Sequence, residues 1–323
     1  MKLAIVGTNF ISDALVEASR IVPSVEIAAI YSRKLDTGRA FAEKHGIKKV
    51  YTDYDEMLSD DAIEAVYIAS PNICHHSQSI AAMRAGKHVL CEKVMATNPT
   101  EADEMIATSR ETGRVLLEAM RPAHDPIYYT VREYISRIGE LHRVRLEYCQ
   151  YSRRYDRFKA GITTNAFDPT MRNSALADIG VYPLHMALSL FGAPLDLTAE
   201  SQLLHNGFEG SGTLNLYYEN MTAEILYSKI ADSLAPSFIE GELGTVFIDK
   251  ISAPSRIELR LHSGTSVATE TCVSNNMTFE LDAFSRMTRG ILDPEPYQRL
   301  SALTVGLIHR AHSQTGAHAY MGI

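Results

Sequence analysis

The sequence has few cysteines, no long apolar segment and no excess of positive charge. Its four cysteines lie far apart and form no Cys-x-x-Cys pair, so we expect reduced thiols and no metal site. Cys74 precedes two histidines, but neighbouring residues on a helix point in different directions. We therefore predict a helix start there with one buried cysteine. The net charge of -8 argues against a nucleic-acid surface.

The chain contains no apolar run of about 18 residues that would cross a membrane. The first residues, Met1–Gly7, form a short apolar segment that soon reaches a glycine, whereas a signal peptide needs a longer apolar segment and a small-residue cleavage site. We therefore predict a first β-strand here and a cytoplasmic protein. The length of 323 residues exceeds what a single core usually supports, which indicates two domains.

Strands and helices alternate over the first 120 residues. The expected strands are Lys2–Val6, Glu26–Tyr31, Val50–Tyr51, Ala65–Ala69, His88–Cys91 and Val115–Ala119. The expected helices are Ser12–Arg20, Thr37–His45 closed by Gly46, His75–Ala85, and one from Asn98 to Gly113. This alternation predicts an α/β protein whose residues 1–120 form a Rossmann domain, a doubly wound parallel sheet.

Residues 121–323 have a different pattern, with longer apolar runs and more turns, and predict an α+β domain with a large, mostly antiparallel open sheet. The expected strands are Val144–Tyr151, Ala199–Leu204, Thr213–Tyr218, Thr222–Ser228, Thr245–Ile248 and Arg256–His262. The expected helices are Asp178–Leu190, Phe279–Gly290 and Tyr297–His312. The long basic segment Ser152–Ala177 has two interpretations, a lid over the site or an exposed solvated loop, and the sequence leaves both open.

The turn after the first strand, Gly7–Ser12, occupies the place of the glycine-rich dinucleotide fingerprint. Gly7 permits the tight turn, and the helix start behind it offers backbone amides to a pyrophosphate. Asn9 and Ser12 occupy the second and third glycine positions. Asparagine tolerates left-handed backbone, and serine is small enough for close helix–strand packing. The strand-turn-helix context indicates a dinucleotide site.

The end of the second strand bears on the choice of cofactor. NAD-dependent enzymes usually place a carboxylate here to hold the ribose 2′-hydroxyl, but this chain has Ser32, Arg33 and Lys34. A hydroxyl and two cations suit a 2′-phosphate. We therefore predict a preference for NADP over NAD. The alternative interpretation is a solvated basic turn.

Two further strand ends deliver polar residues to the same edge of the parallel sheet. One strand leads into Ser70–Asn72, and another ends in Glu92 and Lys93. Ligands bind at the carboxyl ends of parallel strands. We therefore predict that Lys93 lies beside the nicotinamide ring of the cofactor.

Three reactive side chains, Asp178, Tyr182 and His185, follow one another at helical spacing and are expected on one helix face. A stripe this polar is not expected to face the core. Hydride transfer needs a proton donor or acceptor beside the substrate oxygen. Tyr182 can take this role if the positive charge of Lys93 stabilises its phenolate. His185 would relay protons or bind a hydroxyl, and Asp178 would orient either. Taken singly, each residue also fits a structural role.

These motifs resemble the glucose–fructose oxidoreductase/inositol dehydrogenase (Gfo/Idh/MocA) family. The glycine turn, Ser70–His75, Ala85–Lys93 and Asp178–Tyr182 carry the resemblance, and the Ala-Gly-Lys-His-Val-Leu-Cys-Glu-Lys string is the most specific part. The resemblance implies an NAD(P)-dependent oxidoreductase with a Rossmann domain. It also implies a homodimer or homotetramer formed through the C-terminal sheet.

Lys93, Tyr182 and His185 can each be compared with the family's pattern. Lys93 matches the family's lysine, although the proline that usually follows it is Val94 here. Tyr182 stands where the inositol dehydrogenase branch has histidine, so the chain resembles the glucose–fructose oxidoreductase and dihydrodiol dehydrogenase branch. His185 stands where many relatives have aspartate.

Together these features predict an NAD(P)-dependent dehydrogenase or reductase acting on a small sugar, polyol or diol, without a nucleic-acid or membrane partner. The alternative is a non-catalytic NAD(P)-binding sensor on the same fold. The predicted catalytic residues are Lys93, Tyr182, His185 and Asp178. The predicted cofactor-binding residues are Gly7, Thr8, Asn9, Phe10, Ile11, Ser32, Arg33, Lys34, Ser70, Pro71, Asn72, His75, Glu92 and Lys93.

Overall fold

The structure is a computed structural model that describes residues 1–321, and the chain divides into two compact units. Unit 1 comprises Met1–Arg121 together with Asn275–Ala302, and unit 2 comprises Pro122–Ser274 and the chain from Leu303 onward. The sequence predicted a change near residue 120, but it did not predict that Asn275–Ala302 returns to the first unit. This return supplies a helix to unit 1 that lies far from it in sequence.

Unit 1 is built on a six-stranded sheet in which every neighbouring pair is parallel. The strand order is β3-β2-β1-β4-β5-β6, so the order reverses between β1 and β4, where ligands bind in doubly wound sheets. The predicted Rossmann sheet is confirmed. Its strands are β1 (Lys2–Val6), β2 (Glu26–Tyr31), β3 (Lys49–Tyr51), β4 (Ala65–Ile68), β5 (His88–Glu92) and β6 (Leu116–Ala119).

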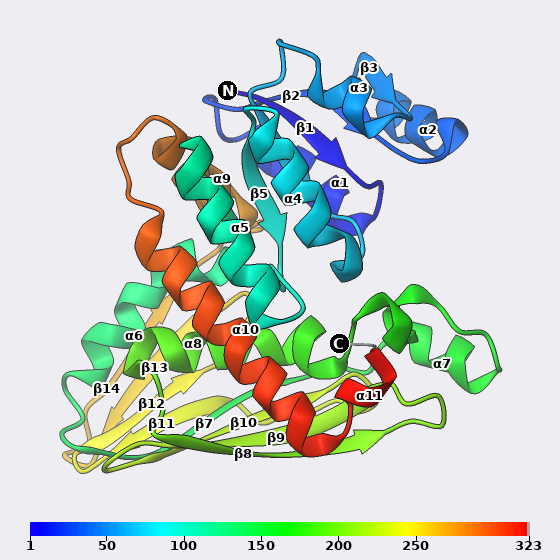
Figure 1. The fold of residues 1–323 in the computed structure, drawn as a ribbon. Helices are drawn as coiled ribbons and strands as arrows, with labels where there is room; N and C mark the ends of the chain where they lie inside the picture. Colours follow the sequence, from blue (N-terminus) through cyan, green and yellow to red (C-terminus); the bar gives the residue numbers. More distant parts are fainter. Residues whose placement is uncertain (322–323) are drawn as a thin grey trace. The chain divides into compact units, whose positions relative to one another are not determined.

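The helices of unit 1 cover this sheet, with α4 beside α5 and α1 beside α9 (Figure 1). Their ends follow from local chemistry: the Asn98 side chain accepts the Glu101 N–H at 3.0 Å, and Gly113 ends the same helix with φ of 64°. The helices are α1 (Phe10–Ser19), α2 (Leu35–His45), α3 (Tyr54–Leu58), the short η1 (Asn72–Cys74), α4 (His75–Arg84), α5 (Pro99–Thr112) and α9 (Met277–Thr288).

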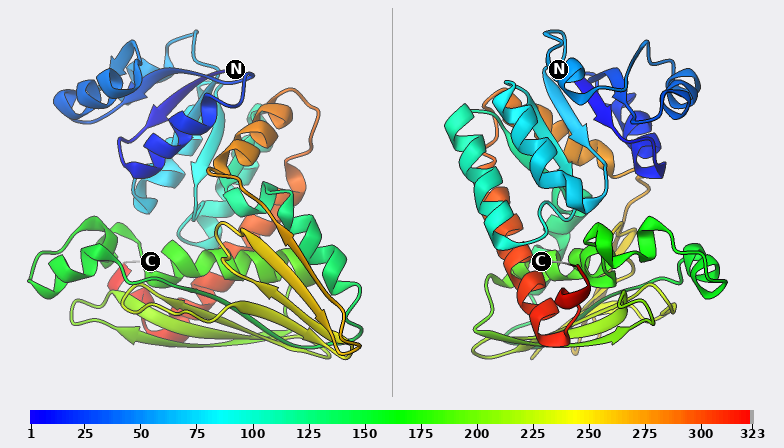
Figure 2. Two further views of the ribbon diagram at one scale, coloured as in Figure 1. Left: turned by 180° about the vertical axis from the view of Figure 1, so that it is seen from behind. Right: turned by 45° about the vertical axis from the view of Figure 1, so that its right-hand side comes forward.

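Unit 2 is built on an eight-stranded sheet in the order β14-β13-β12-β11-β7-β10-β9-β8, which Figure 2 shows as one twisted layer. Only β7 and β10 pair in parallel, so the predicted, mostly antiparallel sheet is confirmed. Two of its strands, β11 and β14, were not predicted. The strands are β7 (Leu141–Cys149), β8 (Asp196–Leu203), β9 (Glu209–Tyr217), β10 (Thr222–Ser228), β11 (Ser237–Gly241), β12 (Gly244–Ile248), β13 (Arg256–Leu261) and β14 (Ser266–Glu270).

The helices of unit 2 differ most from the prediction. The expected helix Asp178–Leu190 is a π-helical turn, η5 (Leu176–Gly180), followed by α8 (Val181–Phe191), which lies across β7 and β10 (Figure 1). The others are η2 (Arg121–His124), α6 (Ile127–Ile135), α7 (Arg153–Lys159), η3 (Asn165–Phe167), η4 (Pro169–Met171) and α11 (His318–Met321); α10 (Glu295–Thr315) starts in unit 1 and ends in unit 2.

The segment Ser152–Ala177 contains α7, and its Phe158 and Phe167 belong to a small apolar cluster that also includes Phe208. All four cysteines are free. Among residues 1–321, no helix is long and apolar enough to cross a bilayer, and no group of three or more metal-ligating side chains is found.

Candidate functional site

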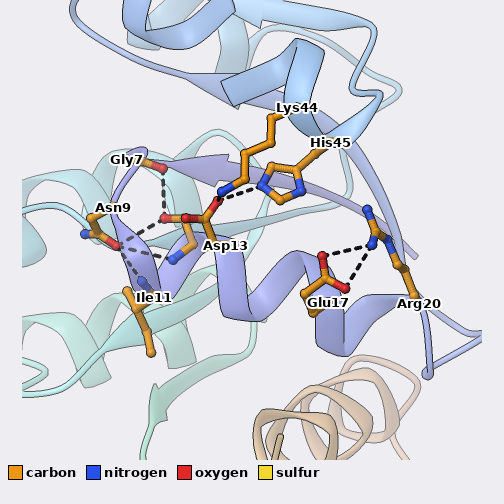
Figure 3. Close-up of polar contacts among 9 residues, drawn as sticks. Gly7, Asn9, Ile11, Asp13, Glu17, Arg20, Lys44 and His45 are labelled. Atoms are coloured by element: carbon orange, nitrogen blue, oxygen red, sulfur yellow. Dashed lines mark hydrogen bonds and ion pairs between the residues drawn. The ribbon is translucent and has the colours of Figure 1, made fainter. Parts of the chain in front are cut away.

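The turn between β1 and α1 closes around Gly7. Its φ is +107°, and a Cβ here would lie 2.8 Å from the carbonyl oxygen of Ala69 on the neighbouring strand end, so only glycine fits. Asn9 caps α1, since its Oδ1 accepts the N–H groups of Ile11 (3.1 Å) and Ser12 (3.2 Å) (Figure 3). The Ser12 hydroxyl donates to the Gly7 carbonyl at 2.9 Å. Asn9 and Ser12 therefore shape the turn through side-chain bonds where the fingerprint has glycines.

The start of α1 is also tied to the end of α2. The Asp13 carboxylate lies 2.7 Å from Lys44 Nζ and 2.6 Å from His45 Nε2 (Figure 3). Partial burial by itself raises the pKa of Asp13, but the hydrogen bonds from Lys44 and His45 bring that pKa below its ordinary value. The contact fixes α2, the helix that begins directly after the basic turn Ser32–Lys34.

A cavity of about 500 Å³ opens at the carboxyl ends of β1, β2 and β4. Its lining contains no carboxylate. Seven of the predicted cofactor-binding residues line it, namely Gly7, Thr8, Ser32, Arg33, Lys34, Ser70 and Pro71. The other lining residues are Val6, Tyr31, Thr37, Cys74 and Gln78, none of which was predicted to bind the cofactor. The predicted residues outside the lining are Asn9, Phe10, Ile11, Asn72, His75, Glu92 and Lys93.

A buried serine, Ser32, holds the shape of the basic turn that carries Arg33 and Lys34. Ser32 Oγ donates to the Lys34 carbonyl at 3.0 Å and accepts the Lys34 N–H at 3.3 Å, so this hydroxyl folds the turn. Gly38 on α2 packs against it, since a Cβ there would lie 3.2 Å from Ser32 Cβ. Arg33 and Lys34 are exposed at the cavity. The turn therefore places two positive charges at the cavity.

His75 joins two loops of this rim. One ring nitrogen lies 2.9 Å from the Ser70 carbonyl oxygen and the other 2.8 Å from that of Val94. A neutral imidazole has one N–H, so it donates to only one of these carbonyls at a time. Burial lowers the pKa of His75. Its contacts are those of a residue that positions the loops.

Glu92, which precedes Lys93, is engaged within unit 1. Its Oε1 accepts the Tyr67 hydroxyl, and its Oε2 accepts the Lys93 backbone N–H at 3.3 Å. Burial raises the pKa of Glu92, while the charge of Lys93 acts in the opposite direction. Glu92 is therefore placed to hold the backbone that carries Lys93.

Two more buried carboxyl groups lie in unit 1, and the sequence indicated neither. Glu118 Oε1 accepts the Met95 N–H at 2.7 Å, and its Oε2 accepts the Ser301 hydroxyl at 2.7 Å. Glu280 is fully buried, and neither of its carboxyl oxygens has a hydrogen-bond partner. Burial raises the pKa of Glu280 well above its ordinary value, and the charge of Glu92 adds to this shift. Burial therefore favours the protonated form of the Glu280 carboxyl group.

In unit 2, the polar stripe Asp178, Tyr182, His185 is mostly buried, contrary to the prediction. Tyr182 is 7% exposed and His185 is 2% exposed, whereas the Asp178 side chain is 32% exposed. The wider π-helical turn breaks the expected spacing, because its hydrogen bonds span five residues. Burial lowers the pKa of His185 to about 3, and His124 adds to this. The His185 imidazole is therefore neutral at neutral pH.

Asp178 has a buried partner that the sequence did not indicate. Lys229, directly after β10, places its Nζ 2.7 Å from Asp178 Oδ2 and donates to the Ala166 carbonyl at 2.6 Å. The ammonium lies over the rings of Phe167 (4.8 Å) and Phe208 (5.0 Å). A contact between residues about 50 positions apart has no local sequence signal.

Both parts of the chain match family models. Residues 1–120 match the model described as an oxidoreductase family with an NAD-binding Rossmann fold, and residues 128–246 match the GFO/IDH/MocA C-terminal domain. A scyllo-inositol 2-dehydrogenase (NADP(+)) of Bacillus subtilis is 42% identical over 82% of this chain and 80% of its own length. An uncharacterized oxidoreductase of Escherichia coli is 34% identical over 98% of this chain and 97% of its own.

More distant similarities agree with these matches. A trans-1,2-dihydrobenzene-1,2-diol dehydrogenase of Xenopus tropicalis is 29% identical over 72% of this chain and 70% of its own length. Among solved structures, a 3-ketoreductase from Actinomadura kijaniata in complex with NADP and TDP-benzene superposes with a TM-score of 0.88 at 21% identity, covering 98% of both chains. At this identity the superposition shows a shared fold.

Proposed function

Because the chain belongs to the Gfo/Idh/MocA family of oxidoreductases, with an NAD-binding Rossmann fold at residues 1–120, we propose that it transfers a hydride between NADP(H) and a polyol, sugar or diol. The reacting carbon carries a hydroxyl in one direction and a carbonyl in the other. This substrate class is supported by the printed activities of the inositol and dihydrodiol dehydrogenases to which the chain is similar.

The observation that carries the cofactor assignment is the lining of the cavity in unit 1. Arg33 and Lys34 are exposed at a cavity without a carboxylate, and the Ser32 hydroxyl holds their turn in place. Cations at this position suit the 2′-phosphate of NADP, whereas a carboxylate there would suit the 2′-hydroxyl of NAD. The similar Bacillus subtilis dehydrogenase is named as NADP-dependent, which supports the same choice.

We assign the proton chemistry to Lys93 and Tyr182. A tyrosine transfers a proton to or from the substrate oxygen when a nearby cation stabilises its phenolate, and a lysine supplies such a cation. Asp178, the most exposed of the three predicted groups in unit 2, supports substrate binding. His185 receives a packing role in place of the predicted proton relay, since burial keeps its imidazole neutral.

The test is a panel of inositols, aldoses, ketoses and dihydrodiols, assayed with NADP and NAD in parallel by the change in nicotinamide absorbance. We expect turnover with at least one member, faster with NADP. Binding of NADP without turnover on any member would instead favour a non-catalytic sensor, and equal or faster rates with NAD would refute the cofactor preference.

A further inference from the structure

We propose that Lys229 is a positioning residue for the reaction: its buried ammonium fixes the orientation of the Asp178 carboxylate on the π-helical turn η5. The inference rests on the proposed function, in which Asp178 belongs to the substrate site. It adds a residue outside every motif that connects the chain to its family.

The Lys229 ammonium is confined by the groups that surround it. The Lys229 side chain is 4% exposed, and its Nζ joins two separate segments, the Asp178 carboxylate in η5 and the Ala166 carbonyl in η3. A lysine on the surface samples many rotamers, but this ammonium lies over the neighbouring rings of Phe167 and Phe208. Its position is therefore set by four surrounding groups, and it transmits that position to Asp178.

The π-helical turn η5, which carries Asp178, is held by contacts from other elements. A π-helical turn is wider than an α-helical one and rare, so external contacts are expected to hold it. One end of η5 is held by the buried Glu209, whose Oε2 accepts the Leu176 N–H at 2.9 Å and whose Oε1 accepts the Ser201 hydroxyl at 2.5 Å and the Tyr227 hydroxyl at 3.0 Å. Lys229 holds the turn through the Asp178 carboxylate, so Glu209 and Lys229 contact the turn at two separate points.

The two partners of the ion pair, Asp178 and Lys229, differ in exposure. The Asp178 side chain is 32% exposed, whereas that of Lys229 is 4% exposed. The carboxylate thus lies at the surface of unit 2 with the cation beneath it. Lys229 is therefore expected to act through Asp178 and not through direct contact with the substrate.

The test compares Lys229→Met with a matched control, Lys87→Met. Methionine keeps an unbranched side chain of similar length. Lys87 in unit 1 is also buried, but its Nζ donates to the Asp60 carbonyl at 3.0 Å and pairs with no carboxylate. Both variants lose one buried ammonium, so a general cost of that loss appears in both. Thermal unfolding first establishes that each variant is folded.

The rate of hydrogen exchange of the backbone amides in Leu176–Gly180 measures how firmly the turn is held, and it requires no substrate. We expect exchange there to be at least about tenfold faster in Lys229→Met and unchanged in Lys87→Met, because the turn loses its ion pair with a buried cation. Unchanged exchange in folded Lys229→Met would overturn the proposal.

Steady-state kinetics measure how the loss of the Lys229 ammonium affects the reaction. We expect kcat/KM for the substrate to fall about a hundredfold in Lys229→Met, as a misplaced catalytic group typically costs, while KM for NADP stays within about twofold. Propylammonium should partly rescue Lys229→Ala but leave Lys87→Ala unchanged, an effect that a purely structural role would not produce.

The outcomes separate the two claims. A wild-type protein that turns over no substrate refutes the proposed function and the part of the inference that concerns the reaction, while the exchange result still decides whether Lys229 positions the turn. Normal kcat/KM in a Lys229→Met variant with faster exchange refutes the role in the reaction alone.

Discussion

Replacement of Arg33 by alanine tests the proposed preference for NADP at an exposed cation of the cavity lining. Arg33 lines a cavity of about 500 Å³ whose lining contains no carboxylate. A hydrogen bond to a charged group contributes about 1.5–3 kcal/mol, and an exposed one belongs at the lower end of that range. A loss of about 1.5–2 kcal/mol corresponds to a roughly 10- to 30-fold weaker affinity for NADP.

The assay measures dissociation constants and initial rates for NADP and NAD, with Arg39→Ala as the control. Arg39 is an exposed arginine on the same helix that begins at this turn, but it does not line the cavity. The Arg33→Ala penalty should be confined to NADP and shrink as salt is added, because exposed charges are screened. Equal losses for NADP and NAD, or the same loss in Arg39→Ala, would refute the assignment of Arg33 to the 2′-phosphate.

Three further predictions address the catalytic pair, the glycine turn and acid stability. Lys93→Met and Tyr182→Phe should each lower turnover by about 10²- to 10⁴-fold while leaving NADP affinity within about twofold; wild-type rates in either variant would refute its assignment. Gly7→Ala should weaken NADP binding and cost about 1–3 kcal/mol of stability, since φ is +107° and the new Cβ would lie 2.8 Å from the Ala69 oxygen; an unchanged unfolding midpoint and affinity would contradict this. Burial lowers the pKa of His185 to about 3, so below about pH 6.5 the unfolded chain takes up a proton that the folded chain does not. The contribution of His185 to the free energy of unfolding is therefore fully present above about pH 6.5. It falls by up to about 1.4 kcal/mol per pH unit as the pH decreases towards 3. Urea unfolding at pH 7 and pH 5 should show a smaller acid loss in His185→Asn, and an equal loss would count against this account.

Local chemistry made much of unit 1 predictable. The start of α5 follows from Asn98 and Pro99, and its end follows from Gly113, because caps and left-handed glycines act within a few residues. The end of α2 at Gly46 has the same cause. The basic turn after β2 was also visible in the sequence, and Arg33 lines the cavity as expected.

The features that escaped prediction depend on contacts between distant residues. The π-helical turn at Asp178 is held by Glu209 and Lys229, which lie about 30 and 50 residues further along the chain. The burial of His185 follows from the packing of α8 on the sheet, and periodicity alone placed it on a polar face. The burial of Glu280 arises because Asn275–Ala302 returns to the core of unit 1 after the whole of the second sheet.

The most direct test of the central claim is the rate of nicotinamide reduction by the wild-type protein on the polyol, sugar and diol panel, with NADP and NAD at equal concentration. The account predicts reduction of NADP by at least one compound, a higher kcat/KM with NADP than with NAD, and near-complete loss of the signal in Tyr182→Phe. Tight NADP binding without reduction by any compound would contradict it.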